Sequence, residues 1–168
     1  MIKRLLLILG VICLVAAGAT AGFIIWEHHR TDSGIPDAII QKPAFTVFSH
    51  DPSDKTWKIQ TADAAYDTSQ GILKLKFIHN GNTMTLTEQV TPGVFTDIPT
   101  YYQALLGKLK EYAEIQTTIG TVALTHPVEL KGGQSAVIST QGTLMFAHPD
   151  HGLSIGDWQE FFDAMRKV

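Results

Sequence analysis

Residues 5–26 form a run of apolar and small side chains without one charge, and this run constrains everything that follows it. A helix of this length is roughly 33 Å long, enough to cross the hydrocarbon core of a bilayer. Lys3 and Arg4 precede the run, and Trp26 at its end is a residue type that favours the membrane–water interface. We therefore predict a single-pass transmembrane helix whose N-terminal tail, residues 1–4, is cytoplasmic.

A cleaved secretory signal peptide is the competing interpretation. Lys3 and Arg4 would then form the basic region, and Ala19-Thr20-Ala21 would be an A-x-A cleavage site. Against cleavage, hydrophobic residues resume after this site, over residues 22–26. Both interpretations place residues 31–168 outside the cytoplasm, bound to the cell membrane in the first and secreted in the second.

Small residues in the apolar run predict association between anchors. Gly18 and Gly22 form a G-x-x-x-G pair, and Ala17 and Ala21 repeat the spacing one residue earlier. Positions four apart share one helix face, so two backbones can approach closely in lipid and form a homodimer. A monomeric anchor is the alternative, because residues 16–22 are small throughout and the spacing arises almost automatically.

The rest of the chain predicts one domain behind a tether. Pro36 and Pro43 interrupt residues 27–43, and residues 44–168 have the length of an ordinary domain with its own core. A formal charge of −3 gives no electrostatic case for binding nucleic acid. Because the single cysteine, Cys13, lies in the apolar run, the outer domain has no internal disulfide.

The clearest local pattern is a β-hairpin. Residues 72–78 and 83–90 alternate apolar with polar side chains, and Asn80-Gly81 between them is the preferred type I′ turn. This turn sets Phe77 opposite Met84 and Leu75 opposite Leu86, so we expect one buried and one solvent-exposed face. A second hairpin is predicted over residues 135–140 and 143–147.

Two amphipathic helices complete the predicted fold. The first is capped by Thr96 or Asp97, has Pro99 in its first turn and carries an apolar stripe. Its members are Ile98, Tyr101, Tyr102, Leu105, Leu106, Leu109 and Tyr112. The second begins at Ser154 with Asp157 as a capping-box partner, and its stripe is Trp158, Phe161, Phe162 and Met165. The order strands, helix, strands, helix predicts an α+β domain, an antiparallel sheet with both helices against one face.

Candidate sites in the sequence are few. His148 and His151, with Asp150 between them, are potential zinc ligands, and His50 and His126 are further recruits. Zinc sites use three or four protein ligands, and no other spacing supplies them, so we assign no metal and no cofactor. No serine stands in a G-x-S-x-G motif, and no glycine-rich loop precedes a helix as a phosphate site requires. We therefore expect that the protein is not an enzyme.

Glu88 breaks the hairpin pattern. Extending the register places it opposite Leu73, on the apolar face, where a carboxylate is costly unless it is paired or protonated. The alternative is that the strand bends or ends first and lets Glu88 reach water.

Aromatic residues of both helices give a last candidate, a groove between the helices and the sheet. The residues in question are Tyr101, Tyr102, Tyr112, Trp158, Phe161 and Phe162. Packing in the core is the simpler interpretation. A cavity lined by Tyr102, Leu106 and Trp158 would instead indicate a carrier of small ligands or lipids.

Three segments resemble small extracytoplasmic bacterial domains of unknown function: Thr85-Leu86-Thr87-Glu88-Gln89, Gly142-Thr143-Leu144-Met145-Phe146-Ala147 and Leu153-Ser154. The resemblance covers about residues 44–168. Such domains often follow a single membrane anchor and sometimes belong to anti-sigma-factor-like proteins. With four residues before the anchor, we expect no cytoplasmic sigma-binding segment. The resemblance implies a non-catalytic envelope domain that binds another envelope component or serves in a complex, and it carries over no active-site residue.

Overall fold

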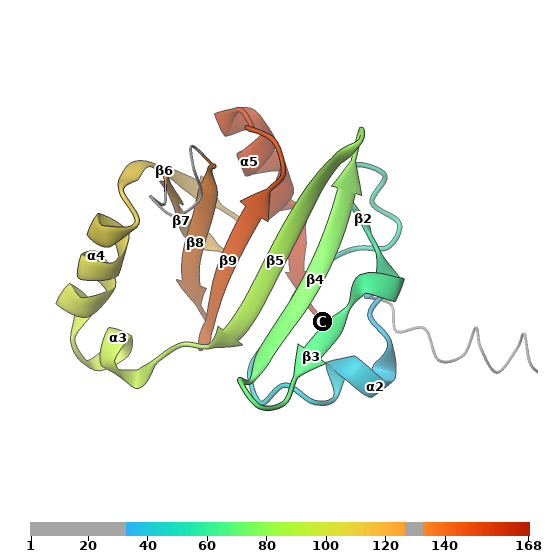
Figure 1. Cartoon of the computed structure of the whole chain (residues 1–168), viewed down its shortest axis with the longest axis horizontal. Helices are drawn as coiled ribbons and strands as arrows, with labels where there is room; N and C mark the ends of the chain where they lie inside the picture. Colours follow the sequence, from blue (N-terminus) through green and yellow to red (C-terminus); the bar gives the residue numbers. More distant parts are fainter. Residues whose placement is uncertain (1–32, 127–132) are drawn as a thin grey trace, which may run out of the picture.

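The computed structural model describes residues 33–126 and 133–168, which form one large antiparallel sheet in the order β2-β4-β5-β9-β8-β7-β6, with β3 also paired to β4 (Figure 1). The strands of this sheet are β2 (Lys58–Ile59), β3 (Ala65–Asp67), β4 (Ile72–His79), β5 (Asn82–Val90), β6 (Glu111–Thr117), β7 (Gly120–Thr125), β8 (Ser135–Thr140) and β9 (Thr143–Pro149). A separate ribbon pairs β1 (Phe48–His50) with β10 (Met165–Lys167). The α+β class is thus confirmed.

The hairpin of β4 and β5 has the predicted register. Asn80 and Gly81 both have positive φ angles, 49° and 84°, as a type I′ turn requires. Phe77 pairs with Met84 and, at the far end, Leu73 pairs with Glu88. The second predicted hairpin is also present, because β8 pairs with β9 across Gln141 and Gly142.

One face of the sheet is covered by α5 (Ile155–Asp163) and by the β1–β10 ribbon. The Ser154 side chain accepts a hydrogen bond from the Asp157 backbone N–H, and Asp157 accepts one from the Ser154 backbone N–H in return, which confirms the capping box. Trp158, Phe161 and Phe162 are fully buried in the main core. Met165, which the sequence assigned to this helix, instead begins β10, because α5 ends at Asp163 with Ala164 as its C-cap.

The opposite face is covered by α3 (Gly93–Asp97) and α4 (Pro99–Lys108). Leu106 packs there with Ala123, Val137 and Leu144 in a second apolar cluster. The prediction that both helices lie on one face is therefore wrong. The cause is visible in β8 and β9, where consecutive residues are buried, so both faces of these strands need a cover.

The first predicted helix is divided at Ile98, which has φ −134° and ψ 85°. A proline disfavours the helical conformation in the residue before it, so Pro99 begins α4 while Ile98 stays extended. No side chain caps α4, contrary to the expected role of Thr96 or Asp97. Tyr112 belongs to β6 rather than to the helix, because Lys110 takes a positive φ of 56° and ends the helical path.

The chain enters the domain earlier than residue 44. Ile35 is fully buried in the main core, and α2 (Asp37–Ile40) follows it. Short connecting turns, including η1 (Thr61–Asp63), complete this edge. The predicted tail, transmembrane helix, Gly18 and Gly22, and the first part of the tether lie outside the described residues. Among residues 33–126 and 133–168 no helix is long and apolar enough to cross a membrane.

Candidate functional site

The helices α3 and α4 are apolar on two sides. Their inner side packs on the sheet through Phe95, Tyr102, Leu106 and Leu109. Their outer side carries a second set of apolar residues, which we call the outer stripe: Val94, Ile98, Tyr101 and Leu105. Val94 lies on α3 and Ile98 lies at the break between the two helices. Tyr101 and Leu105 are four residues apart, so they share one side of α4. A helix that is apolar on two sides normally has a second neighbour.

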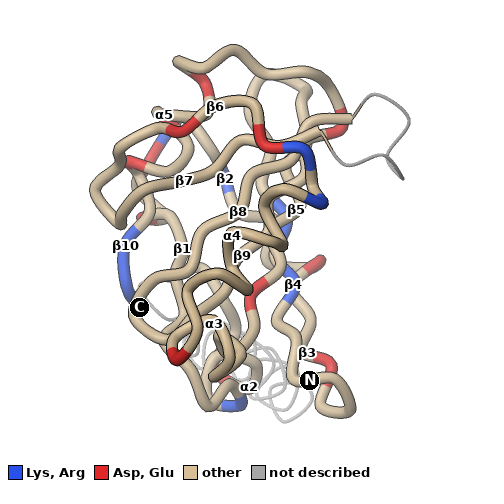
Figure 2. Tube along the Cα trace, turned by 90° about the vertical axis from the view of Figure 1, so that its left-hand side faces the viewer, with Lys and Arg blue, Asp and Glu red and all other residues tan. Residues whose placement is uncertain are grey.

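Most of the outer stripe is exposed to solvent in this structure. Val94, Ile98 and Tyr101 have exposed fractions of 51%, 46% and 53%, and Leu105 is half-buried. Asp97 and Lys108 are the charged residues of residues 93–108, and the trace of α3 and α4 in Figure 2 is accordingly mostly uncharged. The stripe therefore presents an apolar surface with little charge.

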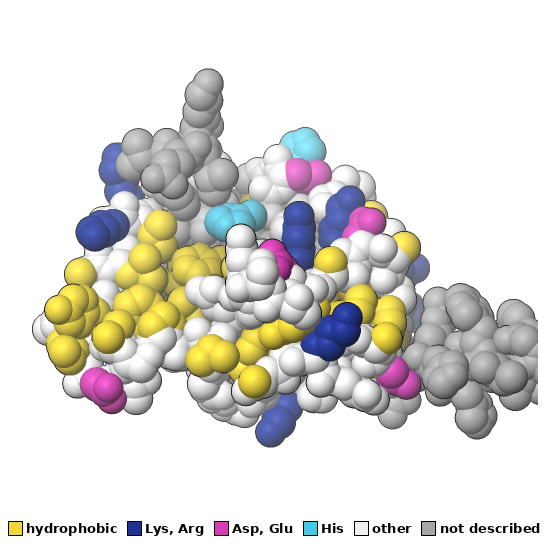
Figure 3. Space-filling view, turned by 60° about the horizontal axis from the view of Figure 1, so that its bottom comes forward, with side chains coloured by type: hydrophobic (Ala, Val, Ile, Leu, Met, Phe, Trp, Pro, Cys, Tyr) yellow, Lys and Arg dark blue, Asp and Glu magenta, His cyan; other side chains and the backbone are white. Residues whose placement is uncertain are grey.

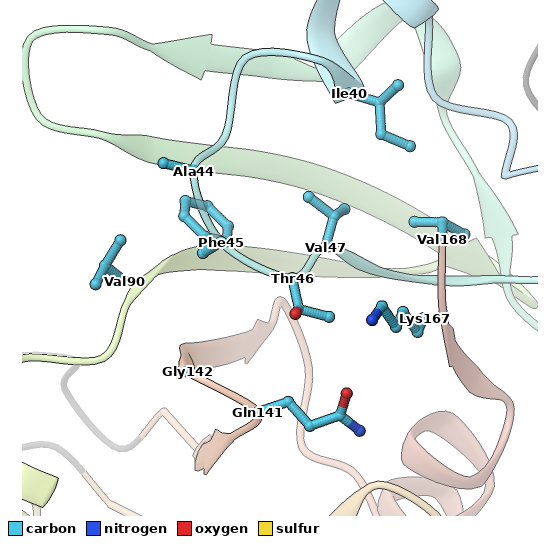
Figure 4. A pocket seen from close by; sticks show the side chains of 10 residues that line it. All are labelled: Ile40, Ala44, Phe45, Thr46, Val47, Val90, Gln141, Gly142, Lys167 and Val168. Carbon is cyan, nitrogen blue, oxygen red and sulfur yellow. The ribbon is translucent and has the colours of Figure 1, made fainter.

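A pocket of about 470 Å³ lies at the edge of the sheet, where β5 ends at Val90. This edge pocket has an apolar wall made of Ile40, Ala44, Phe45, Val47, Val90 and Val168. Figure 4 shows Phe45 and Val90 at one end and Lys167 and Val168 at the other. Backbone hydrogen bonding from Val168 N–H to the Val47 carbonyl, at 3.1 Å, joins two of its walls. Val90 lines the pocket, is 54% exposed and lies three residues before the start of α3, so the chain leads from the pocket to the stripe. Figure 3 shows apolar side chains spread along the lower side of the molecule.

The candidate groove between the two helices does not form among these residues. Tyr102 and Leu106 belong to the cluster on one face of the sheet, whereas Trp158 belongs to the core on the other. The six aromatic residues named from the sequence thus line no common groove. Tyr112 instead stacks on His126, with ring centroids 4.2 Å apart.

Glu88 lies where the hairpin register placed it, and the alternative of an outward bend is wrong. Its side chain is fully buried, and β5 continues past it to pair Glu88 with Met145 of β9. The backbone N–H of Phe48 donates to both carboxyl oxygens, at 3.3 and 3.2 Å. Burial raises the pKa of Glu88 well above its ordinary value, and the Phe48 hydrogen bond opposes this only in part. Glu88 therefore ties β1 to the sheet through the Phe48 N–H.

The histidines proposed as zinc ligands are separated. His148 is half-buried in β9 opposite Thr85, where burial lowers its pKa, and His151 is exposed, with its Nδ1 3.0 Å from an Asp150 oxygen. Asp150 also accepts a hydrogen bond from the Thr83 backbone at 2.8 Å. Within the part of the chain that the structure describes, no three His, Cys, Asp or Glu side chains are grouped to hold a metal ion.

His50 is a buried polar residue that the sequence suggested only as a possible additional zinc ligand. Its ring lies between Phe77 and Phe161, with centroids 4.8 and 4.7 Å away. Burial lowers the pKa of His50 to about 4, while Asp54, whose oxygen lies 3.6 Å from Nδ1, acts in the opposite direction. Neither ring nitrogen makes a hydrogen bond of good geometry within the described residues. A short polar strand before a turn carries no pattern that would reveal such a position.

Comparisons of this chain with protein-family models, with curated proteins and with solved structures gave no match. The candidate sites therefore stand on their geometry alone.

Glu88→Gln should change how stability depends on pH. The folded protein keeps a proton that the unfolded chain releases above about pH 4.5, so wild-type stability falls as pH rises from there toward the folded pKa. Glutamine keeps the shape without the ionisation. In denaturant unfolding of the full chain in detergent, the variant should lose this fall, which is at most about 1.4 kcal/mol per pH unit. Glu160→Gln, an exposed position on α5, is the control, and parallel curves for all three proteins would refute a buried neutral carboxyl.

His50→Phe should remove an opposite dependence. The unfolded chain takes up a proton below about pH 6.5, whereas folded His50 does so only near pH 4, so wild-type stability falls as pH falls through this window. Phenylalanine fits between the two aromatic neighbours and needs no hydrogen bond. The same unfolding assay should show stability at pH 7 within about 1 kcal/mol of wild type and a flatter acid limb. A variant as acid-sensitive as wild type, or one several kcal/mol weaker, would contradict this account.

Proposed function

We propose that this chain is a membrane-anchored binding domain of the cell envelope, with its N-terminus in the cytoplasm and residues 31–168 outside. The single observation that supports binding most strongly is the outer stripe, an apolar row on helices whose other side already covers the sheet. The uncharged run at residues 5–26 supports the anchor. We propose binding without catalysis, as the sequence led us to expect.

The physical reason for binding is the apolar area that the stripe leaves in water. Removing apolar surface from water contributes about 25 cal/mol per Å². Val94, Ile98 and Tyr101 are each about half exposed. A neighbour that covers them therefore gains more binding free energy than one that covers an equal area of charged surface. Apolar residues that are exposed singly need no explanation, whereas several close together on α3 and α4 do.

The edge pocket supports a second candidate function, the binding of a small amphipathic ligand. Its volume of about 470 Å³ lies in the range of ligand pockets, and an apolar wall next to Lys167 suits an apolar chain with an anionic end. Val90→Trp would fill the edge pocket. A domain that works through this pocket should lose ligand on that change, whereas one that works through the stripe should be unaffected.

The membrane anchor leads to a topology prediction. Protease added to spheroplasts should remove residues 31–168, and intact chain should remain with membranes through carbonate extraction, because the apolar run is long enough to span the bilayer. Immunoblots against the outer domain and mass spectrometry measure both. A soluble product that begins near Thr20 or Gly22 would show instead that the run is a cleaved signal peptide.

Replacing the outer stripe should leave the fold intact. Val94→Ser, Ile98→Ser and Tyr101→Ser together should cost at most about 1 kcal/mol in unfolding free energy, because these side chains are already half in water. Leu106→Ala, on the inner side of the same helix, should cost about 2–5 kcal/mol. Denaturant unfolding of the full chain in detergent compares them. A stripe variant as damaged as Leu106→Ala would mean that the stripe is part of the core and no binding surface.

A further inference from the structure

We infer that the outer stripe rests on the lipid bilayer that holds the anchor. This inference rests on the proposed function, since it requires the predicted transmembrane helix at residues 5–26. It names what covers the outer stripe: the headgroup and upper acyl region of the membrane, rather than a second protein.

The connection between the predicted anchor and the folded domain is short. Ser33 is 2% exposed and Ile35 is fully buried, so the folded domain begins by residue 33. Six residues, 27–32, separate it from the end of the predicted anchor. Even fully extended, they span only about 20 Å. The domain is therefore held against the bilayer surface and presents some face to it at all times.

Apolar side chains lie along the same edge of the molecule as α2, near the point where the chain enters the domain. In Figure 1, α2, which follows the point where the chain enters the domain, and α3 lie along the same lower edge of the molecule. Figure 3 shows that edge from below, with apolar side chains spread along it. A bilayer beneath this edge meets the stripe while the connection stays short.

The chemistry of the edge fits an interface. Tyrosine is enriched at the membrane–water boundary, where an apolar ring and a polar hydroxyl are both satisfied, and Tyr101 is 53% exposed at the centre of the stripe. Lys42 follows α2, and Lys167 lines the edge pocket, both exposed. Lysines near a surface with anionic lipids strengthen binding to it, and Asp37 of α2 and Asp97 of α3 oppose them.

The size of the stripe favours lipid over a protein. Four partly exposed side chains give at most a few hundred Å², whereas a stable protein interface buries about 800 Å² on each partner. A domain already tethered at the surface needs much less, because a short linker gives an effective concentration in the millimolar range. Burial of a small apolar area is then enough to keep the stripe in contact with the bilayer.

The test measures contact between α4 and lipid in the full chain. With Cys13→Ser as background, Ala104→Cys on α4 carries a fluorescent label next to the stripe, and Glu160→Cys on α5, on the opposite face of the sheet, carries the matched control. Each protein is reconstituted into vesicles of phosphatidylcholine and phosphatidylglycerol brominated in the upper acyl chain. We expect at least about twofold stronger quenching at 104 than at 160, because bromine quenches only on contact. Adding the three serine substitutions in the stripe should reduce the difference.

The outcomes separate this inference from the proposed function. Protein that fails to float with the vesicles or leaves them in carbonate would overturn the anchor and the inference together. Protein that floats but shows equal quenching at the two positions would overturn the inference and leave the anchor standing. A label at 104 that is shielded in native membranes but unquenched in vesicles would also overturn it, in favour of a protein partner.

Discussion

Burial of β8 and β9 on both faces is the constraint on which the rest of this structure depends. Val137 and Leu144 point to the cluster under α4, whereas Ile138 and Met145 point to the core under α5. A sheet with two apolar faces needs two covers. The helices are therefore placed on opposite sides, and α4, short and only partly covered, keeps its outer apolar side in solvent.

Two buried titratable groups on the main-core side affect stability in opposite ways. Glu88 holds β1 to the sheet through the Phe48 N–H, and its raised pKa makes the folded protein more stable at acidic pH. His50, at the other end of β1, has a lowered pKa and makes the folded protein more stable at neutral pH. Their effects partly cancel between about pH 4.5 and 6.5. Both contact or belong to β1, a strand of three residues: Glu88 accepts from its first residue, Phe48, and His50 is its last.

Local chemistry explains which features the sequence could predict. Asn80-Gly81 determines the turn type, and the turn type determines the register of β4 and β5. The register predicted from this turn is correct along the whole hairpin, including the Leu73–Glu88 pair at its far end. The Ser154–Asp157 capping box is equally local. Which face each helix covers depends on contacts between distant segments, and the sequence pattern of α4 was compatible with either. The burial of Glu88 was open for the same reason: only β1 and β9, packed around it, decide between a bend and a buried carboxyl.

Three of the four residues of the outer stripe stand in the apolar pattern that the sequence showed, whereas Val94 does not. Ile98, Tyr101 and Leu105 were grouped with Tyr102, Leu106 and Leu109 as one broad apolar side. The sheet covers only the second group, which packs with Ala123, Val137 and Leu144. An apolar side wider than one contact surface is the signal that pointed to a second neighbour.

The central claim is that the outer stripe is covered in the working protein, and amide hydrogen exchange of the full chain tests it most directly. Exchange is compared between native membranes and detergent solution, with α5 as the internal reference. The account predicts slower exchange over residues 93–108 in membranes and no change over residues 155–163, because a covered helix pair opens less often. Equal exchange over residues 93–108 in both environments would contradict it.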